Sequence, residues 1–138
     1  ISIDENNKVI EIAKSLEDYG ALTKSYSYLG GIYKRLKDSV NALKYHNKEL
    51  KFAQITKNEI DIAYANLHLA EVYSELYKKH DLALNLAKKA QKLFTKNNFD
   101  RKLLLQNRFF KDLRENINTN KWIGADINSQ YHNTVVAS

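Results

Sequence analysis

The stretch Tyr26-Ser-Tyr-Leu29-Gly30-Gly-Ile-Tyr33 decides the fold, and it returns forty residues later as Asn66-Leu-His-Leu69-Ala70-Glu-Val-Tyr73. In both copies a Leu is followed at once by a small residue and then, three positions on, by Tyr. This order places a bulky, a small and a second bulky side chain on one helical face, which a neighbouring helix can approach closely. The fixed period predicts a repeated pair of helices.

Composition sets the limits of this interpretation. The chain has 138 residues, of which 43% are hydrophobic, which is enough for one domain with a core. It has no Cys, so disulfides and thiolate chemistry are excluded, and it has no Pro and only four Gly, which suits nearly continuous helix. No apolar run approaches the roughly 20 residues needed to cross a bilayer, so we expect a cytoplasmic protein without a membrane segment. Because Met is absent, we expect the sequence to be a piece of a longer or processed protein.

The two copies resemble the tetratricopeptide repeat, whose signature is an aromatic, Leu-Gly and Tyr in a first helix followed by spaced small and aromatic residues in a second. The matching residues are Tyr26, Leu29, Gly30, Tyr33 and Ala42 in the first copy and Leu69, Ala70, Tyr73, Ala83 and Ala90 in the second. Three positions depart from the signature: Asn66 replaces the first aromatic, and His46 and Ala87 replace the aromatic of the second helix. The period near 40 is similar to that of the long repeats found in signalling proteins.

The resemblance implies an all-α fold, a right-handed α-solenoid of antiparallel helix pairs. We expect this helical repeat domain over residues 1–117, followed by a polar tail over 118–138 that folds back through Trp122. Within the domain the expected parts are a partial unit 5–20, a repeat 21–58, a repeat 59–98 and a degenerate capping unit 99–117.

Local signals set the expected helix ends. Tyr19-Gly20 is expected to break the chain after a first helix whose apolar stripe is Val9, Ile12, Ala13 and Leu16. Three residues are expected to cap helix N-termini: Asp38, Asn58 and Asp81. Asn66 interrupts an apolar stripe, so its amide is expected to be hydrogen-bonded in the core or to lie at its edge, because an unpaired buried amide would cost about 1–3 kcal/mol.

The net charge of +6 is carried mainly by the second helices. Their lysines are Lys44, Lys48, Lys51, Lys88, Lys89 and Lys92. We interpret them as a solvated convex face, with nucleic-acid binding as the alternative. The acidic segment 59–81 between them would repel phosphates, so nucleic acid is the less favoured partner.

Motifs for catalysis and cofactors are missing. The four His residues, His46, His68, His80 and His132, lack zinc-site spacing, and we expect no second ligand type to cluster with them and no metal site. Gly30-Gly31 lies within a helical stripe rather than in a phosphate-binding loop. No sequence context supports a nucleophilic triad, and we expect neither enzymatic activity nor a cofactor.

The resemblance implies that the first helices line a concave groove for a peptide or protein segment. The groove residues carried over are Lys24, Ser27, Tyr28, Gly31, Lys34, Arg35, Tyr64, Leu67, His68, Glu71, Ser74, Glu75 and, in the capping unit, Arg108 and Asp112. Tyr28, Tyr64 and His68 are the expected anchors, because rigid aromatic side chains provide contact area at low entropy cost. The basic residues of the first repeat suit an acidic end of the ligand, and Glu71 and Glu75 suit a basic one.

The sequence therefore predicts a non-catalytic scaffold for protein-protein interaction, the sensory or interaction region of a larger signalling or regulatory protein. A clamp for chaperone C-terminal carboxylates is disfavoured, because Ser27 and Gly31 stand where Lys and Asn would be needed. Two alternatives remain open: nucleic-acid binding through the basic convex helices, and a homodimerisation module.

Overall fold

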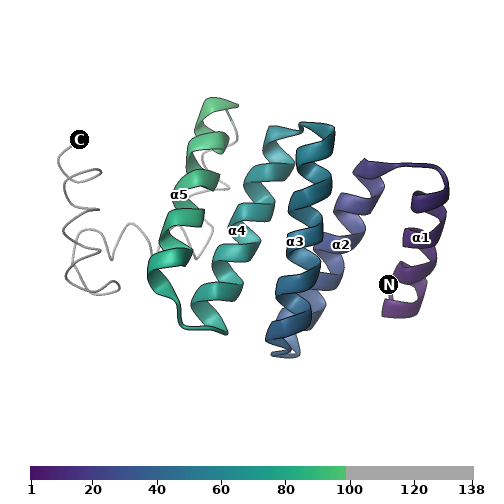
Figure 1. The fold of residues 1–138 in the computed structure, drawn as a ribbon, viewed down its shortest axis with the longest axis horizontal. Coiled ribbons are helices and arrows are strands. Elements are labelled where there is room, and N and C mark those ends of the chain that lie inside the picture. Colours follow the sequence, from purple (N-terminus) through teal and green to yellow (C-terminus); the bar gives the residue numbers. More distant parts are fainter. Residues whose placement is uncertain (99–138) are drawn as a thin grey trace.

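The computed structural model describes residues 1–98 and is all-helical over that range. Its helices are α1 (Ile3–Ser15), α2 (Tyr19–Arg35), α3 (Ser39–Thr56), α4 (Glu59–Glu75) and α5 (His80–Lys96). Each helix packs against the next one in the chain, from α1 at one end to α5 at the other (Figure 1). In addition α2 contacts α4, which brings the two copies of the repeated stretch side by side.

The turns between helices repeat a single backbone device. The residue immediately before each of the N-caps of α2 to α5 adopts a left-handed conformation, with positive φ at Glu17 (53°), Lys37 (59°), Lys57 (58°) and Lys78 (56°). Left-handed residues end helices by turning the chain away from the helix axis, and here the position is filled by charged residues rather than glycine. The absence of Gly from these turns explains why turn signals in the sequence were weak.

Side-chain caps define where α2, α3 and α4 begin. The expected N-caps Asp38 and Asn58 are confirmed, since they accept the backbone N–H groups of Asn41 and Asp61 at 3.1 and 3.0 Å. The expected break at Tyr19-Gly20 is wrong, because Tyr19 is the first residue of α2. Asp18 caps this helix by accepting the N–H of Ala21 at 3.0 Å, which moves the break upstream.

The expected capping role of Asp81 is also wrong. Helix α5 begins at His80, and its N-cap position is held by Lys79, which makes no side-chain capping hydrogen bond. The Lys79 backbone N–H instead donates to the Tyr73 carbonyl at 2.9 Å, and the helix begins two residues earlier than an Asp81 cap would require. Asp81 then lies in the first turn, where its charge still complements the helix dipole.

Helix α1 uses a different face from the expected one. Its buried residues are Asn6, Ile10 and Ala13, and the Asn6 side chain donates to the Ser25 carbonyl of α2 at 3.0 Å. The stripe of Val9, Ile12 and Leu16 is exposed, with 40%, 60% and 71% of these residues accessible. Of the predicted stripe, Ala13 alone is buried.

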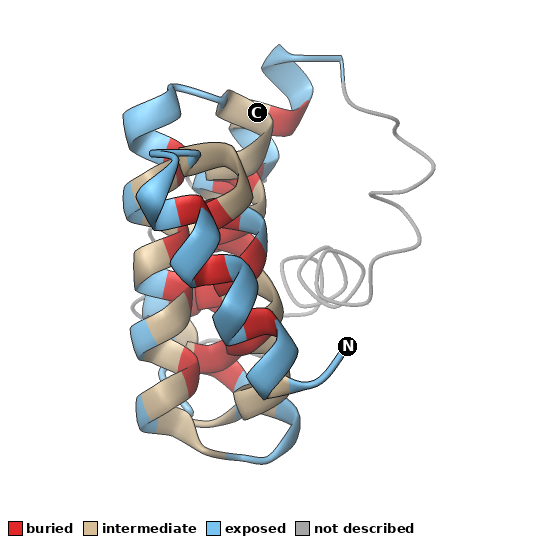
Figure 2. Ribbon diagram, turned by 90° about the vertical axis from the view of Figure 1, so that its right-hand side faces the viewer, coloured by how far each residue is buried: buried red, intermediate tan, exposed pale blue. Residues whose placement is uncertain are grey.

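The core is divided between the two ends of the row of helices, and Figure 2 shows the buried segments turned toward neighbouring helices. One cluster joins α1 to α2 through Ile10, Ala13, Leu22, Tyr26 and Leu29. The other joins α4 to α5 and is rich in alanine: Ala63, Leu67, Ala70, Ala83, Leu84, Ala87, Ala90 and Phe94. Every one of these alanines is fully buried, so the backbones of α4 and α5 can approach closely.

Between α2 and α3 the two faces meet through a column of stacked rings. Tyr33, Tyr45, Tyr26, Phe52 and Tyr19 follow one another with centroids 5.5 to 6.0 Å apart and interplanar angles of 12° to 16°. The rings come from positions seven residues apart on each helix, so they lie on one side of it. Offset ring pairs of this kind contribute about 0.5–1.5 kcal/mol each beyond their buried area, which makes α2 and α3 a firmly joined pair.

Two further observations complete the fold. The amide of Asn66 is buried and donates to the Ile62 carbonyl at 3.0 Å, which confirms the expected hydrogen-bonded core amide. None of the helices within residues 1–98 has the length and apolar composition to span a membrane. The capping unit 99–117, the tail 118–138 with Trp122, and the groove residues Arg108 and Asp112 lie outside the described residues.

Candidate functional site

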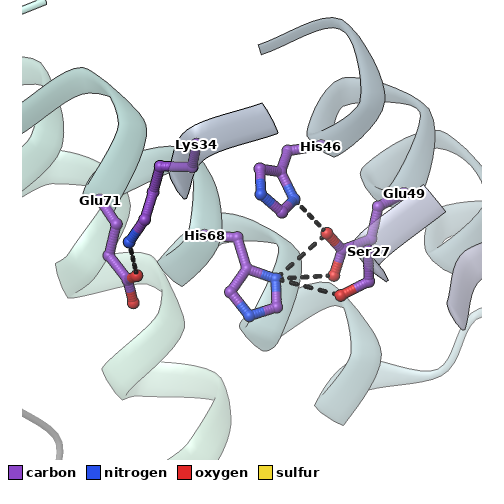
Figure 3. Close-up of polar contacts among 6 residues, drawn as sticks. All are labelled: Ser27, Lys34, His46, Glu49, His68 and Glu71. Atoms are coloured by element: carbon purple, nitrogen blue, oxygen red, sulfur yellow. Dashed lines mark hydrogen bonds and ion pairs between the residues drawn. The ribbon is translucent and has the colours of Figure 1, made fainter. Parts of the chain in front are cut away.

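A buried carboxylate flanked by two imidazoles lies where α3 meets α4 (Figure 3). Glu49, whose side chain is 2% exposed, has one oxygen 2.7 Å from His46 Nδ1. Its other oxygen is 3.0 Å from His68 Nδ1. Because an ionised carboxylate can only accept, both ring nitrogens donate to it. Glu49 therefore has its charge compensated without reaching solvent.

Local geometry on α3 brings His46 and Glu49 together, since residues three apart face the same side of a helix. The room for the His46 ring comes from Gly30 on α2. A Cβ atom at Gly30 would lie 2.5 Å from His46 Cε1 and 2.6 Å from each ring nitrogen, too close for any side chain. The second copy of the stretch has Ala70 and Ala87 at the corresponding positions, a small pair in place of a glycine and a ring.

Charge and burial oppose each other at this cluster. Burial by itself would lower the pKa of His68, but the hydrogen bond to Glu49 and its negative charge outweigh burial, and the pKa of His68 is raised. Burial would raise the pKa of Glu49, but the hydrogen bonds from His46 and His68 outweigh it, and the pKa of this carboxyl is lowered. The ionised pair of Glu49 and His68 is therefore favoured near neutral pH.

An ion pair lies beside the cluster and joins the two copies of the stretch. Lys34 of α2 contacts Glu71 at 2.9 Å and Glu75 at 2.8 Å, one turn apart on α4. Burial would lower the pKa of Lys34, but the hydrogen bonds and charges of the two glutamates raise it overall. Lys34 therefore stays charged and fixes α2 to α4 at this level.

Of the fourteen groove residues predicted over the whole chain, the structure brings some together on the shared surface of α2 and α4. Ser27 and His68 approach each other at 3.5 Å, and Lys34 meets Glu71 and Glu75 as above. We use the name α2/α4 face for these contacting residues together with three partly exposed predicted groove residues of the same two helices; its members are Ser27, Tyr28, Gly31, Lys34, Tyr64, His68, Glu71 and Glu75.

The aromatic residues of the α2/α4 face are half-buried. The Tyr64 ring lies 6.0 Å from the His68 ring and meets Phe94 edge-on at 5.0 Å, and burial raises the pKa of its hydroxyl. The Tyr28 hydroxyl donates to the carbonyl of Ile1. Both rings are thus held in place by the chain and keep part of their surface accessible.

Two predicted groove residues are misplaced, and two others stand apart. Leu67 is 3% exposed and packs into the α4–α5 core, so its prediction as a groove residue is wrong. Ser74 is also buried, with its hydroxyl 3.1 Å from His80 Nδ1. Both side chains therefore contact α5. Lys24 and Arg35 are exposed near the ends of α2.

The sequence analysis missed His46 and Glu49. His46 was interpreted as a substitute for a core aromatic, and Glu49 was not considered. The expectation that no second ligand type clusters with the histidines is wrong, since Glu49 lies between two of them. The sequence signal for this site is a difference between the two copies. The first copy has Gly30 and His46, whereas the second has Ala70 and Ala87 at the corresponding positions.

The cluster cannot act as a nucleophilic triad. In such a triad the carboxylate holds one ring nitrogen while the hydroxyl uses the other. Here Ser27 and Glu49 approach the same atom, Nδ1 of His68, at 3.5 and 3.0 Å. No proton path from the hydroxyl through the ring to the carboxylate exists in this arrangement.

A shallow cleft of about 280 Å³ lies elsewhere, between α1 and α3. It is lined by Asn7, Lys8, Ile10, Glu11, Lys14, Tyr26, Tyr45 and Lys48. Burial lowers the pKa of Lys48, and the charges of Lys44, Lys14 and Lys51 lower it further. None of the predicted groove residues lines this cleft, so the concave feature and the predicted binding face are on different parts of the molecule.

A scan against protein-family models and searches of curated proteins and of solved structures give no match to this chain.

Proposed function

We propose that this chain is a non-catalytic binding module that takes a peptide or protein segment along the α2/α4 face. In this proposal the helices form a right-handed solenoid of the tetratricopeptide type, with α2 and α4 as the inner helices. Three features support the arrangement: the packing of each helix on the next, the contact of α2 with α4, and the period of forty residues between the two copies.

The observation that carries the proposal is Gly31. It lies inside α2, where glycine costs about 0.8–1.0 kcal/mol relative to alanine. A Cβ atom at this position would meet nothing within 4 Å, so no contact inside the described chain requires a glycine. Its neighbour Gly30 is explained by the His46 ring. A bare patch of helix backbone allows a second chain to approach closely, which accounts for the glycine at position 31.

The surroundings of Gly31 suit a peptide that is mostly polar with one aromatic or aliphatic side chain. Tyr28 and His68 provide half-buried rings, and partly accessible rings are frequent anchors for a partner. Glu75 is 53% exposed at its side chain, so it can pair with a basic group of the ligand while Lys34 stays bound to Glu71. Catalysis is not part of the proposal, since the His68 geometry lacks a proton path to Ser27.

A displayed library of random twelve-residue peptides, selected on the full chain, tests the proposal. We expect peptides whose affinity falls at least tenfold for Gly31→Leu, because the added side chain fills the bare patch. Gln91→Leu is the matched control, since it adds the same side chain at an exposed position of α5 and should leave binding unchanged. A selection that gives no peptide, or peptides that bind Gly31→Leu as well as wild type, refutes the proposal.

A further inference from the structure

We propose that His46, Glu49 and His68, brought together at the contact of α3 with α4, form a binding site for a divalent transition-metal ion of the zinc class. This site goes beyond peptide recognition and does not depend on it. It would join two helices that belong to different copies of the repeat. Its basis is the convergence of three ligand-type side chains, which is unique among residues 1–98.

The spacing of the donor atoms fits an ion. One ligand atom from each residue lies within 4.8 Å of the other two. The carboxylate oxygens are 2.7 Å from His46 Nδ1 and 3.0 Å from His68 Nδ1. Around zinc, bonds of about 2.0–2.2 Å in tetrahedral geometry set neighbouring donors about 3.3 Å apart. Small outward movements of the three side chains therefore open the position that an ion needs.

The donor types select the metal. Two imidazoles and one carboxylate suit Zn²⁺, Co²⁺, Ni²⁺ or Cu²⁺, whereas Mg²⁺ and Ca²⁺ require shells made almost wholly of oxygen. Ligation requires that each Nδ1 lose or move the proton it donates to Glu49. The neutral ring can do so by carrying its proton on Nε2, and Glu49 is then relieved of its hydrogen bonds by the ion.

Burial leaves one route to the site. The side chains of His46 and Glu49 are 3% and 2% exposed, while His68 is 27% exposed and faces the α2/α4 surface. An ion can enter on the His68 side, and a water molecule can complete its shell there, as in zinc sites with three protein ligands. Ser27 Oγ, 3.5 Å from His68 Nδ1, can hydrogen-bond that water.

Nearby charges favour a cation. Two ammonium groups of α2 oppose it: Lys34, which is paired at 2.9 and 2.8 Å with Glu71 and Glu75, and Lys24, whose charge acts on Asp61. Asp61 of α4 also faces Glu49 closely enough for the two charges to interact. Counting Glu49 itself, carboxylates outnumber ammonium groups around the site, so a divalent ion reduces the excess negative charge.

Titration of the chelator-treated full chain with Co²⁺, followed by its visible spectrum, and with Zn²⁺ by calorimetry tests the site. We expect saturable one-to-one binding, a rise in melting temperature with metal, and at least tenfold weaker binding for His68→Gln. His80→Gln is the matched control: the same substitution at the start of α5, away from the cluster, should leave binding unchanged.

Folding is checked separately, because His46 and Glu49 are buried. His68 is the most accessible of the three, so His68→Gln should keep the helical circular dichroism of wild type. Wild type without saturable binding of either ion, or equal affinity of wild type and His68→Gln, overturns the proposal. So does loss of binding in His80→Gln or in His132→Gln. Peptide selection run with chelator present remains a separate measurement, so failure of one proposal leaves the other intact.

Discussion

Replacement of Gly30 by alanine should destabilise the protein, although alanine is the better helix former. In most exposed helix positions Gly→Ala stabilises by about 0.4–1 kcal/mol, since the unfolded chain loses freedom. At Gly30 the new Cβ would lie 2.5–2.6 Å from three atoms of the His46 ring. This ring is buried and held by Glu49 at 2.7 Å, so it cannot move aside without cost.

The magnitude follows from two alternatives for His46. If the ring stays, overpacking costs about 1–3 kcal/mol. If it swings out, its hydrogen bond to a charged group is lost, at about 1.5–3 kcal/mol. Either cost, less the gain of about 1 kcal/mol in helix propensity, leaves Gly30→Ala destabilising by up to about 2 kcal/mol.

Two companion variants sharpen the prediction. Gly31→Ala is one residue away, in the same helix, and its Cβ meets open space, so it should stabilise by up to about 1 kcal/mol. In a chain that already carries His46→Ala, Gly30→Ala should change sign and become stabilising, because the ring that it would overlap is gone. The combined variant has the small-residue pair that the second copy carries as Ala70 and Ala87.

Urea unfolding at pH 7, followed by circular dichroism, gives the free energies and checks that the slope m is unchanged. The four variants, Gly30→Ala, Gly31→Ala, His46→Ala and the double substitution, form a cycle whose coupling energy isolates the Gly30–His46 contact. A shift of Gly30→Ala in the same direction and of the same size as Gly31→Ala would falsify the reasoning. Absence of coupling in the cycle would contradict it equally.

Two further predictions concern the charged cluster and the ring column. The stability that His68 contributes is fully present below its ordinary pKa of 6.5 and is lost as the pH rises through its higher pKa in the folded protein. The stability that Glu49 contributes is fully present above its ordinary pKa of 4.5 and is lost as the pH falls through its lower pKa in the folded protein. Metal-free urea unfolding across this range should therefore show greatest stability between these two values, and His68→Gln should flatten the limb at higher pH; an unchanged limb contradicts the assignment. Tyr26→Leu should cost about 1–2 kcal/mol by removing two stacked ring pairs, whereas Tyr28→Leu, outside the column, should cost less. Equal losses in the same urea assay would show that the column adds nothing beyond area.

Interactions between residues close in sequence could be predicted from the sequence. The caps Asp38 and Asn58 each bond the N–H group three residues ahead, so their own short segment contains the whole interaction. The helical class could be predicted because each copy, around Leu29-Gly30 and around Leu69-Ala70, carries a helical spacing of side chains within a few residues. The prediction that Asp81 caps α5 was wrong because a hydrogen bond between residues further apart, from the Lys79 N–H to the Tyr73 carbonyl, sets the start of the helix instead.

The face that each helix buries was harder to predict, because a helix with apolar residues on more than one side leaves a choice. On α1 the structure buries Ile10 with Asn6 and exposes Ile12 and Leu16. On α4 it turns Leu67 toward α5 rather than into a groove. In both cases contacts with the neighbouring helix determine which face is buried. An example is the hydrogen bond from the Asn6 amide to the Ser25 carbonyl of α2.

By itself the sequence determined that the described residues 1–98 are helical and where the two copies of the stretch lie, because hydrophobic period and capping act within a few residues. Only the tertiary structure decided that Glu49 would meet His68, nineteen positions further on and in another helix. That meeting depends on how α3 packs against α4, while the His46 ring beside Glu49 occupies space that a Cβ at position 30 of α2 would fill. Close packing between helices is set jointly by side chains far apart in the chain, so no local pattern contains it.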